Sequence, residues 1–157
     1  MAVHDYTAEG KPAAWNHPRN LDEWADYCAG VAQHYRDRGD PVETWYFSIW
    51  NEPNNYGSSG SWSTSEFFDL YDAAAAALRS VEPNIKVGGP STDGNPSSWI
   101  QPLLYDGHDI QFITWHRYGA WDPGLSKPDS EYMAETLHYR GAASDVESWI
   151  DTYRPGE

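Results

Sequence analysis

The chain has 157 residues, which is long enough for one domain with a substantial hydrophobic core. Its net charge is −14, from 24 acidic and 10 basic residues, and the acidic residues are scattered along the chain. This charge disfavours nucleic acid and anionic membranes, so we expect neither as a partner. A lysine-poor acidic surface suits a high-salt cytoplasm, where screening removes self-repulsion; an ordinary acidic soluble protein is the alternative, which we slightly favour.

The single cysteine, Cys28, excludes an intrachain disulfide and leaves the redox compartment open. Its neighbours Trp24 and Val31 predict a small core residue. Residues 1–10 contain no apolar signal-peptide segment, and no apolar run approaches the roughly 20 residues needed to cross a bilayer. We therefore expect a soluble chain, whose parent protein is either cytoplasmic or secreted.

Residues 1–19 predict a loop, because glycine and prolines break any period. Two helices carry clear start signals: Asn20 is a good N-cap with Glu23 three residues on, and Ser63 is followed in the same way by Glu66. The helical spacing of apolar residues, the helix propensity of alanine and the position of prolines in the first helical turn complete the assignment of helices. We expect helices at 20–38, 63–81, 95–104 and about 129–153, the last as one helix or a broken pair.

Three short segments rich in β-branched and aromatic residues predict strands at 44–51, 85–90 and 109–116. Both alternating sets of side chains in the first strand are mostly apolar, which is typical of a parallel sheet covered on both faces. Helices alternate with these strands, so the sequence predicts an α/β fold of parallel βα units. We expect one domain over 1–157, with a loop at 1–19 and βα units at 20–157.

Polar side chains follow each predicted strand, where parallel α/β proteins gather their chemistry. Asn51-Glu52 follows the first strand, Gly88-Gly89-Pro90-Ser91 ends the second, and Trp115-His116-Arg117-Tyr118 ends the third. A glutamate against aromatic walls such as Trp50 loses hydration, which raises its pKa, so Glu52 is a candidate general acid and base.

The side chains near Glu52 suit polar ligands. The amide of Asn51 can bind a substrate hydroxyl, and His116 and Tyr118 lie two apart on the same side of an extended strand. The chain contains 9 Trp and 11 Tyr, which serve either core packing or platforms for sugar rings. No metal-ligand spacing and no phosphate-binding loop occur in the sequence, so we expect no metal and no cofactor.

The stretch WYFSIWNEPN resembles the acid/base segment of the clan A glycoside hydrolases, which are retaining (β/α)8 barrels. IKVGGPST and FITWHRYG are similar to strands 5 and 6 of glycoside hydrolase family 39, the β-xylosidase and α-L-iduronidase family. The resemblance implies that Glu52 is the general acid/base, that Asn51 binds the sugar 2-hydroxyl, and that His116 and Tyr118 line the glycone site. It further implies aromatic walls from Trp15 and Trp50, and a xyloside-type carbohydrate as substrate.

The resemblance also implies a partial TIM barrel, about strands 4 to 6 with helices 3 to 6. A retaining glycosidase needs a second carboxylate, which in this family ends strand 7. Glu131, Glu135 and Glu147 lie in the predicted last helix, and Glu157 lies in a turn, so none is a good nucleophile. We therefore expect an internal fragment that is inactive alone, with an oligomeric state that the sequence leaves open.

Two other classes of function remain open. A non-catalytic carbohydrate-binding protein would keep the Trp-rich cleft; its sugar affinity would respond to Trp50→Ala and not to Glu52→Gln. A structural protein would form a defined oligomer without sugar affinity.

Overall fold

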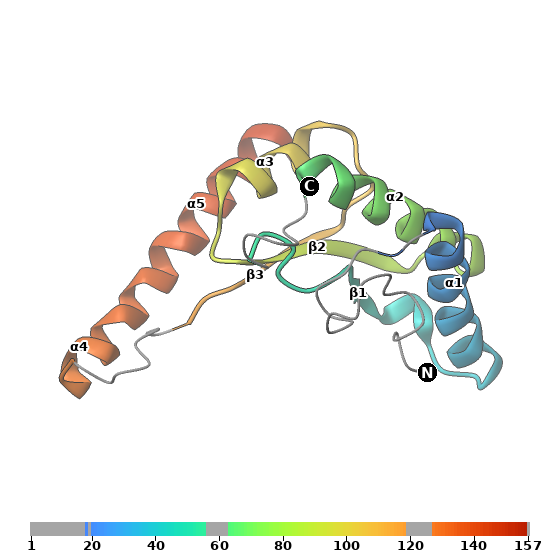
Figure 1. Cartoon of the computed structure of the whole chain (residues 1–157), viewed down its shortest axis with the longest axis horizontal. Coiled ribbons are helices and arrows are strands. Elements are labelled where there is room, and N and C mark those ends of the chain that lie inside the picture. The colour runs from blue at the N-terminus through green and yellow to red at the C-terminus, as the bar shows by residue number, and fades with distance from the viewer. Residues whose placement is uncertain (1–17, 19, 56–62, 119–126, 157) are drawn as a thin grey trace.

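The computed structural model describes residues 18, 20–55, 63–118 and 127–156, and the expected loop at 1–19 lies almost wholly outside them. The described elements alternate between helices and strands, as the sequence predicts (Figure 1). They are α1 (Leu21–Asp37), η3 (Val42–Thr44), β1 (Tyr46–Ser48), α2 (Thr64–Val81), β2 (Lys86–Asp93), α3 (Ser97–Tyr105), β3 (Phe112–His116), α4 (Asp129–Ala134), η5 (Glu135–Leu137) and α5 (His138–Tyr153).

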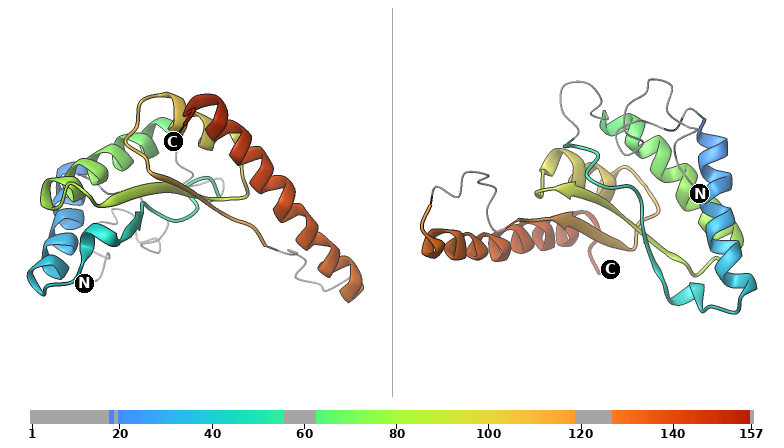
Figure 2. Two further views of the ribbon diagram at one scale, coloured as in Figure 1. Left: turned by 180° about the vertical axis from the view of Figure 1, so that it is seen from behind. Right: turned by 60° about the horizontal axis from the view of Figure 1, so that its bottom comes forward.

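The strands form one parallel sheet in the order β1-β2-β3. One face carries Phe47, Ile49, Val87 and Ile113, which pack into the hydrophobic core. The opposite face carries residues that contact one another across the strands: the rings of Tyr46 and Phe112 meet at 5.1 Å. This face receives no helix within the described residues, as Figures 1 and 2 show, and Tyr46 is 63% exposed there. The prediction of a sheet covered on both faces is therefore not met by the described part of the chain.

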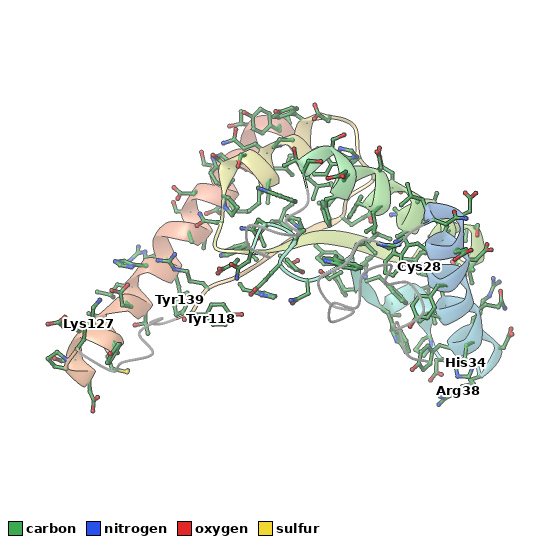
Figure 3. The ribbon with its side chains drawn as sticks, in the orientation of Figure 1. Cys28, His34, Arg38, Tyr118, Lys127 and Tyr139 are labelled. Carbon is green, nitrogen blue, oxygen red and sulfur yellow. The ribbon has the colours of Figure 1, made fainter. Side chains whose placement is uncertain are left out.

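Helix α2 packs beside α1 and supplies many of the buried residues of the core. Phe67, Leu70 and Tyr71 are fully buried, and the Tyr71 hydroxyl donates a hydrogen bond to Asp109 O (2.9 Å). Cys28 on α1 is buried in the same core, as predicted, and burial raises the pKa of its thiol to about 12 (Figure 3). This thiol therefore packs as a small apolar group and is not a nucleophile at neutral pH.

The predicted helix starts are confirmed. Asn20 caps α1 by accepting a hydrogen bond from Asp22 N (2.8 Å). Ser63 and Glu66 form a reciprocal capping box at α2, with Glu66 N donating to Ser63 Oγ (3.2 Å) and Ser63 N donating to Glu66 Oε2 (2.9 Å). These local signals mark where α1 and α2 begin.

The strand bounds differ from the predicted ones. β1 begins only at Tyr46, because Val42–Thr44 forms a 3₁₀ turn, and it ends at Ser48 because Trp50 has a positive φ. β2 runs to Asp93 rather than 90, and a register shift lies between Pro90 and Thr92. The C-terminal helical tract is the broken pair, α4 and α5 joined by η5, and it extends past the edge of the sheet (Figure 1). Within the part of the chain that the structure describes, no helix has the length and apolar character that a membrane span requires.

Candidate active site

The carboxyl ends of β1 and β3 bring three predicted site residues into contact. Glu52 Oε1 accepts a hydrogen bond from the Tyr118 hydroxyl (2.7 Å) and lies 2.6 Å from His116 Nδ1. An ionised carboxylate only accepts hydrogen bonds, so Nδ1 carries the hydrogen in this pair. Glu52 Oε2 accepts from Asn55 Nδ2 (3.1 Å). The carboxyl group is thus held on both oxygens, and Glu52 is only 8% exposed.

A backbone turn of unusual geometry directs Glu52 toward β3. Trp50 has a φ of 69°, Glu52 of 46° and Ser91 of 52°, all in the left-handed region that residues with a Cβ rarely adopt. Glu52 N donates to Ser91 O (2.8 Å), which ties the turn to β2. Such strain persists only where the surroundings hold it, and it gathers at functional sites.

The electrostatics of Glu52 differ from the sequence-based expectation. Burial pushes the pKa of its carboxyl upward, as expected from aromatic neighbours. Hydrogen bonds from Tyr118, His116 and Asn55, with the charge of His116, outweigh burial and place the pKa below its ordinary value of 4.5. The expectation of a raised pKa is wrong for the chain as it stands, because the sequence did not reveal that several donors converge on one carboxyl group.

A cluster of hydroxyl groups lies beside Glu52 on the open face of the sheet. Ser48 Oγ is 2.6 Å from Ser91 Oγ and 3.1 Å from Thr114 Oγ1, and Ser91 Oγ is 2.9 Å from Thr114 Oγ1. Each hydroxyl comes from a different strand, so the cluster joins all three. The sequence analysis did not assign these residues, although a serine inside the apolar run of β1 was a signal for Ser48.

The remaining predicted residues have different outcomes. Asn51 is exposed beside Glu52. The ring of Trp50 meets that of Trp24 on α1 edge-on at 5.7 Å and packs against the hydrophobic core. Trp15 lies outside the described residues. The contacts of Trp50 and Asn51 with a substrate stay predictions.

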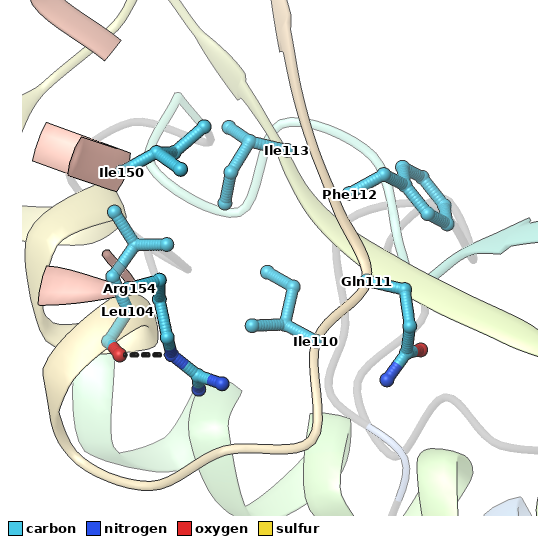
Figure 4. A pocket seen from close by; sticks show the side chains of 7 residues that line it. All are labelled: Leu104, Ile110, Gln111, Phe112, Ile113, Ile150 and Arg154. Carbon is cyan, nitrogen blue, oxygen red and sulfur yellow. Dashed lines mark hydrogen bonds between the residues drawn. The ribbon is translucent and has the colours of Figure 1, made fainter. Parts of the chain in front are cut away.

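Among the described residues, no group of three histidine, cysteine or carboxylate side chains is arranged to hold a metal ion. A cavity of about 170 Å³ lies between the start of β3 and the helices α3 and α5 (Figure 4). Ile110, Ile113 and Ile150 line it, and Arg154 Nε beside it donates to Leu104 O (2.8 Å). This cavity does not include the Glu52 cluster, so the candidate site rests on the side-chain geometry.

With this geometry in view, the sequence was compared with known proteins. The profile of the glycosyl hydrolases family 39 matches residues 9–150, most of the chain. The chain belongs to this family. The resemblance inferred from the NEP segment is thereby confirmed, and so is an α/β fold of the TIM-barrel type with a parallel sheet.

Two relatives of the chain are β-xylosidases by name, and another is an α-L-iduronidase of Mus musculus. The chain is 32% identical over 126 residues to a β-xylosidase of Geobacillus stearothermophilus, covering 76% of this chain and 25% of that protein. It is 34% identical over 107 residues to one of Caldicellulosiruptor saccharolyticus, covering 64% and 22%. The structure of a family 39 β-xylosidase from Caulobacter crescentus aligns with a TM-score of 0.68 at 29% identity, covering 90% of this chain and 29% of that one. The chain therefore spans about a quarter of the length of its curated relatives.

Proposed function

We propose that this chain supplies the acid/base part of a retaining, β-xylosidase-like glycosidase, with Glu52 as the general acid/base. The observation that carries the proposal is the nearly buried Glu52 carboxyl after β1, which His116 and Tyr118 hold from the end of β3. Membership of family 39 and the β-xylosidases among its relatives support the same reaction. The substrate class we propose is a xyloside-type glycoside.

The chemistry is double displacement at the anomeric carbon. A nucleophilic carboxylate attacks that carbon while Glu52 gives its proton to the leaving oxygen; Glu52 then takes a proton from the water that releases the sugar. In this chain the pKa of Glu52 is lowered, which keeps the carboxyl ionised, the form that the base step requires. A second carboxylate about 5 Å away raises the pKa of the first, so the nucleophile itself supports the acid form. The pair of carboxyl groups, Glu52 and the nucleophile, suffices for the reaction, and we propose no cofactor.

We propose that β1, β2 and β3 correspond to barrel strands 4, 5 and 6, within one partial-barrel domain over 1–157 with helices 3 to 6. The carboxylates of the C-terminal tract do not follow a strand: Glu131 lies on α4, Glu147 on α5, and Glu135 in η5, where its Oε2 is 2.7 Å from His138 Nδ1. We therefore propose that the nucleophile is none of these described carboxylates and is absent from this chain. We expect the 157-residue chain alone to have no measurable hydrolase activity.

The other proposed site residues contact the sugar around Glu52. Asn51, exposed beside the carboxyl, binds the 2-hydroxyl, and His116 and Tyr118 line the glycone site. Tyr118 is 54% exposed at the end of β3, so its ring remains accessible to a sugar while its hydroxyl binds Glu52 (Figure 3). Trp50 and Trp15 complete the proposed aromatic walls.

The test combines binding and turnover by the full chain. We expect methyl β-D-xyloside to shift the amide NMR signals of Asn51, Glu52, His116 and Tyr118, and Glu52→Ala to weaken its affinity at least about fivefold, because an alanine cannot hold His116 and Tyr118 in place. Release of 4-nitrophenol from 4-nitrophenyl β-D-xyloside should equal the buffer rate.

Other outcomes contradict the proposal in separable ways. Turnover that Glu52→Gln abolishes would show that the chain holds its own nucleophile. Affinity that survives Glu52→Ala and is lost in Trp50→Ala would indicate the binding-protein alternative. Absence of any shift near Glu52 would rule out a xyloside site there.

A further inference from the structure

Asn54 lies two residues after Glu52 and binds a single backbone unit with both halves of its amide. Its Nδ2 donates to Asp93 O (2.9 Å), and its Oδ1 accepts from Asp93 N (2.9 Å). Strand β1 ends at Ser48, so Asn54 lies in a loop beyond the regular β ladder. The Asn54 side chain takes over the role of backbone pairing and fixes this loop to the end of β2.

The same backbone unit is attached to the residue that holds Glu52. Asp93 pairs in register with His116, and Gly94 N donates to His116 O (2.9 Å). His116 Nδ1 in turn lies 2.6 Å from Glu52 Oε1. The contacts form a closed circuit from the Glu52 loop through Asn54 to Asp93, from there to His116, and back to the Glu52 carboxyl.

This circuit of contacts restrains the turn at Glu52, whose backbone conformation is unfavourable without such contacts. Trp50 and Glu52 both have positive φ, a conformation that L-residues adopt only where neighbouring contacts enforce it. The other described backbone tie of Glu52 to β2 is the bond from Glu52 N to Ser91 O (2.8 Å). One hydrogen bond allows the loop to pivot about it, and the paired bonds of Asn54 two residues later provide a second point of attachment.

We propose that Asn54 is a positioning residue that holds the Glu52 carboxyl against His116 and Tyr118. The proposal rests on the proposed function only in taking Glu52 as the reacting carboxyl. Asparagine suits this place because aspartate lacks the donor to Asp93 O and glutamine is one methylene longer. The expected loss in a variant is the close contact of Glu52 with His116 and Tyr118, while the hydrophobic core remains.

The test is the pKa of Glu52, measured by ¹³C NMR of its carboxyl carbon in the full chain. Both burial and the hydrogen-bond donors act on this pKa only while the loop is held, so in Asn54→Ala it should rise from its lowered value toward the ordinary value of 4.5. Gln111→Ala is the matched control: Gln111 Oε1 accepts from Val87 N (2.8 Å), an equivalent side-chain tie to β2 at the opposite end of the sheet. It should lower the free energy of unfolding and leave the pKa of Glu52 unchanged.

A folded Asn54→Ala chain with the parent's Glu52 pKa would overturn the proposal, and so would an equal shift in Gln111→Ala. If Asn54→Ala does not fold, the proposal is tested in the unmutated chain by hydrogen exchange of the Asn54 side-chain amide. Slow exchange supports the paired bonds with Asp93, and exchange at the rate of an exposed asparagine contradicts them. A chain that shows the Asn54 effect but binds no xyloside would contradict the proposed function alone.

Discussion

At the scale of single residues, the site is organised around one carboxyl group with more donors than its sequence context suggests. Tyr118, His116 and Asn55 all bind Glu52, and two of them share Oε1. Their combined effect exceeds that of burial, so the chain holds Glu52 ionised at neutral pH. The site as it stands holds the carboxyl in its ionised form, and the acid role that we propose for Glu52 requires a further negative charge nearby.

Removing the Tyr118 hydroxyl should show this effect in the stability of the chain. A carboxyl whose pKa is lower in the folded state stabilises the fold above its unfolded pKa, and this contribution is lost as the pH falls through the folded pKa, below 4.5. Tyr118→Phe should therefore raise the pKa of Glu52 and cost roughly 1 kcal/mol of unfolding free energy at pH 7. Urea unfolding at pH 7 and pH 3 measures the difference, which should be smaller at pH 3.

Tyr153→Phe provides a control for this experiment, because the Tyr153 hydroxyl binds Gln101 Oε1 (3.1 Å) on the helical side and does not contact Glu52. Its stability effect should be the same at both pH values. A pH-independent effect of Tyr118→Phe would contradict the assignment of Tyr118 as a determinant of the Glu52 pKa.

At the scale of elements, the approach of β2 to β3 depends on a residue without a side chain. A Cβ added at Gly88 would meet the backbone oxygen of Phe112 and come within 2.7 Å of Phe112 Cδ1. Gly88 and Phe112 are register partners in the parallel ladder. The ring of Phe112 therefore lies over the backbone of β2 and continues to Tyr46 on β1, which joins the strands on the open face.

Gly88→Ala should destabilise the sheet by at least about 2 kcal/mol, because the backbone of β3 cannot move away without breaking the ladder. Thermal unfolding followed by circular dichroism measures the loss. Gly30→Ala is the control: no atom lies within 4 Å of a Cβ at this position of α1, so alanine should be neutral or stabilise the helix by about 0.5–1 kcal/mol. A neutral Gly88→Ala would show that β2 and β3 are less closely packed than described.

At the scale of the whole molecule, charge opposes the compact state. The net charge is −14 over 157 residues, and only 10 residues are basic. The described cations are partly used in specific pairs, such as Arg79 with Asp109 and Lys127 with Glu135. The remaining negative charges repel one another, and the repulsion falls when salt shortens the Debye length.

Salt should therefore stabilise the chain. Between 0.05 and 1 M NaCl at pH 7.5 we expect the Tm to rise by roughly 5 °C or more, since about 1 kcal/mol corresponds to several degrees for a domain of this size. Differential scanning calorimetry measures the shift. The same salt series near pH 5, closer to the sequence pI of about 4.6, should give a much smaller rise. Equal rises at both pH values would mean that salt acts through the apolar surface instead of the charge.

The sequence by itself determined the order of elements, the helix starts and the candidate carboxyl. Those features depend on local physics: Ser63 and Glu66 cap α2 through bonds three residues apart, and apolar spacing on α2 selects its buried face. The WYFSIWNEPN segment indicated Glu52 through its resemblance to the acid/base segment of the clan, and through the cost of burying a carboxylate beside aromatic side chains. The strand bounds were less predictable, since the positive φ of Trp50 ended β1 at Ser48 and pairing with β3 carried β2 to Asp93.

Only the tertiary structure decided how the site is held and in which protonation state. Asn54 is near Glu52 in sequence, yet its function depends on Asp93, 39 residues away. The hydroxyl cluster of Ser48, Ser91 and Thr114 exists only when three strands lie side by side in register. The sign of the Glu52 pKa shift depends on the balance between burial and converging donors, of which Tyr118 is 66 residues distant. The sequence context suggests the burial that raises this pKa, but not the long-range hydrogen bonds that lower it, because those bonds form only when the chain has folded.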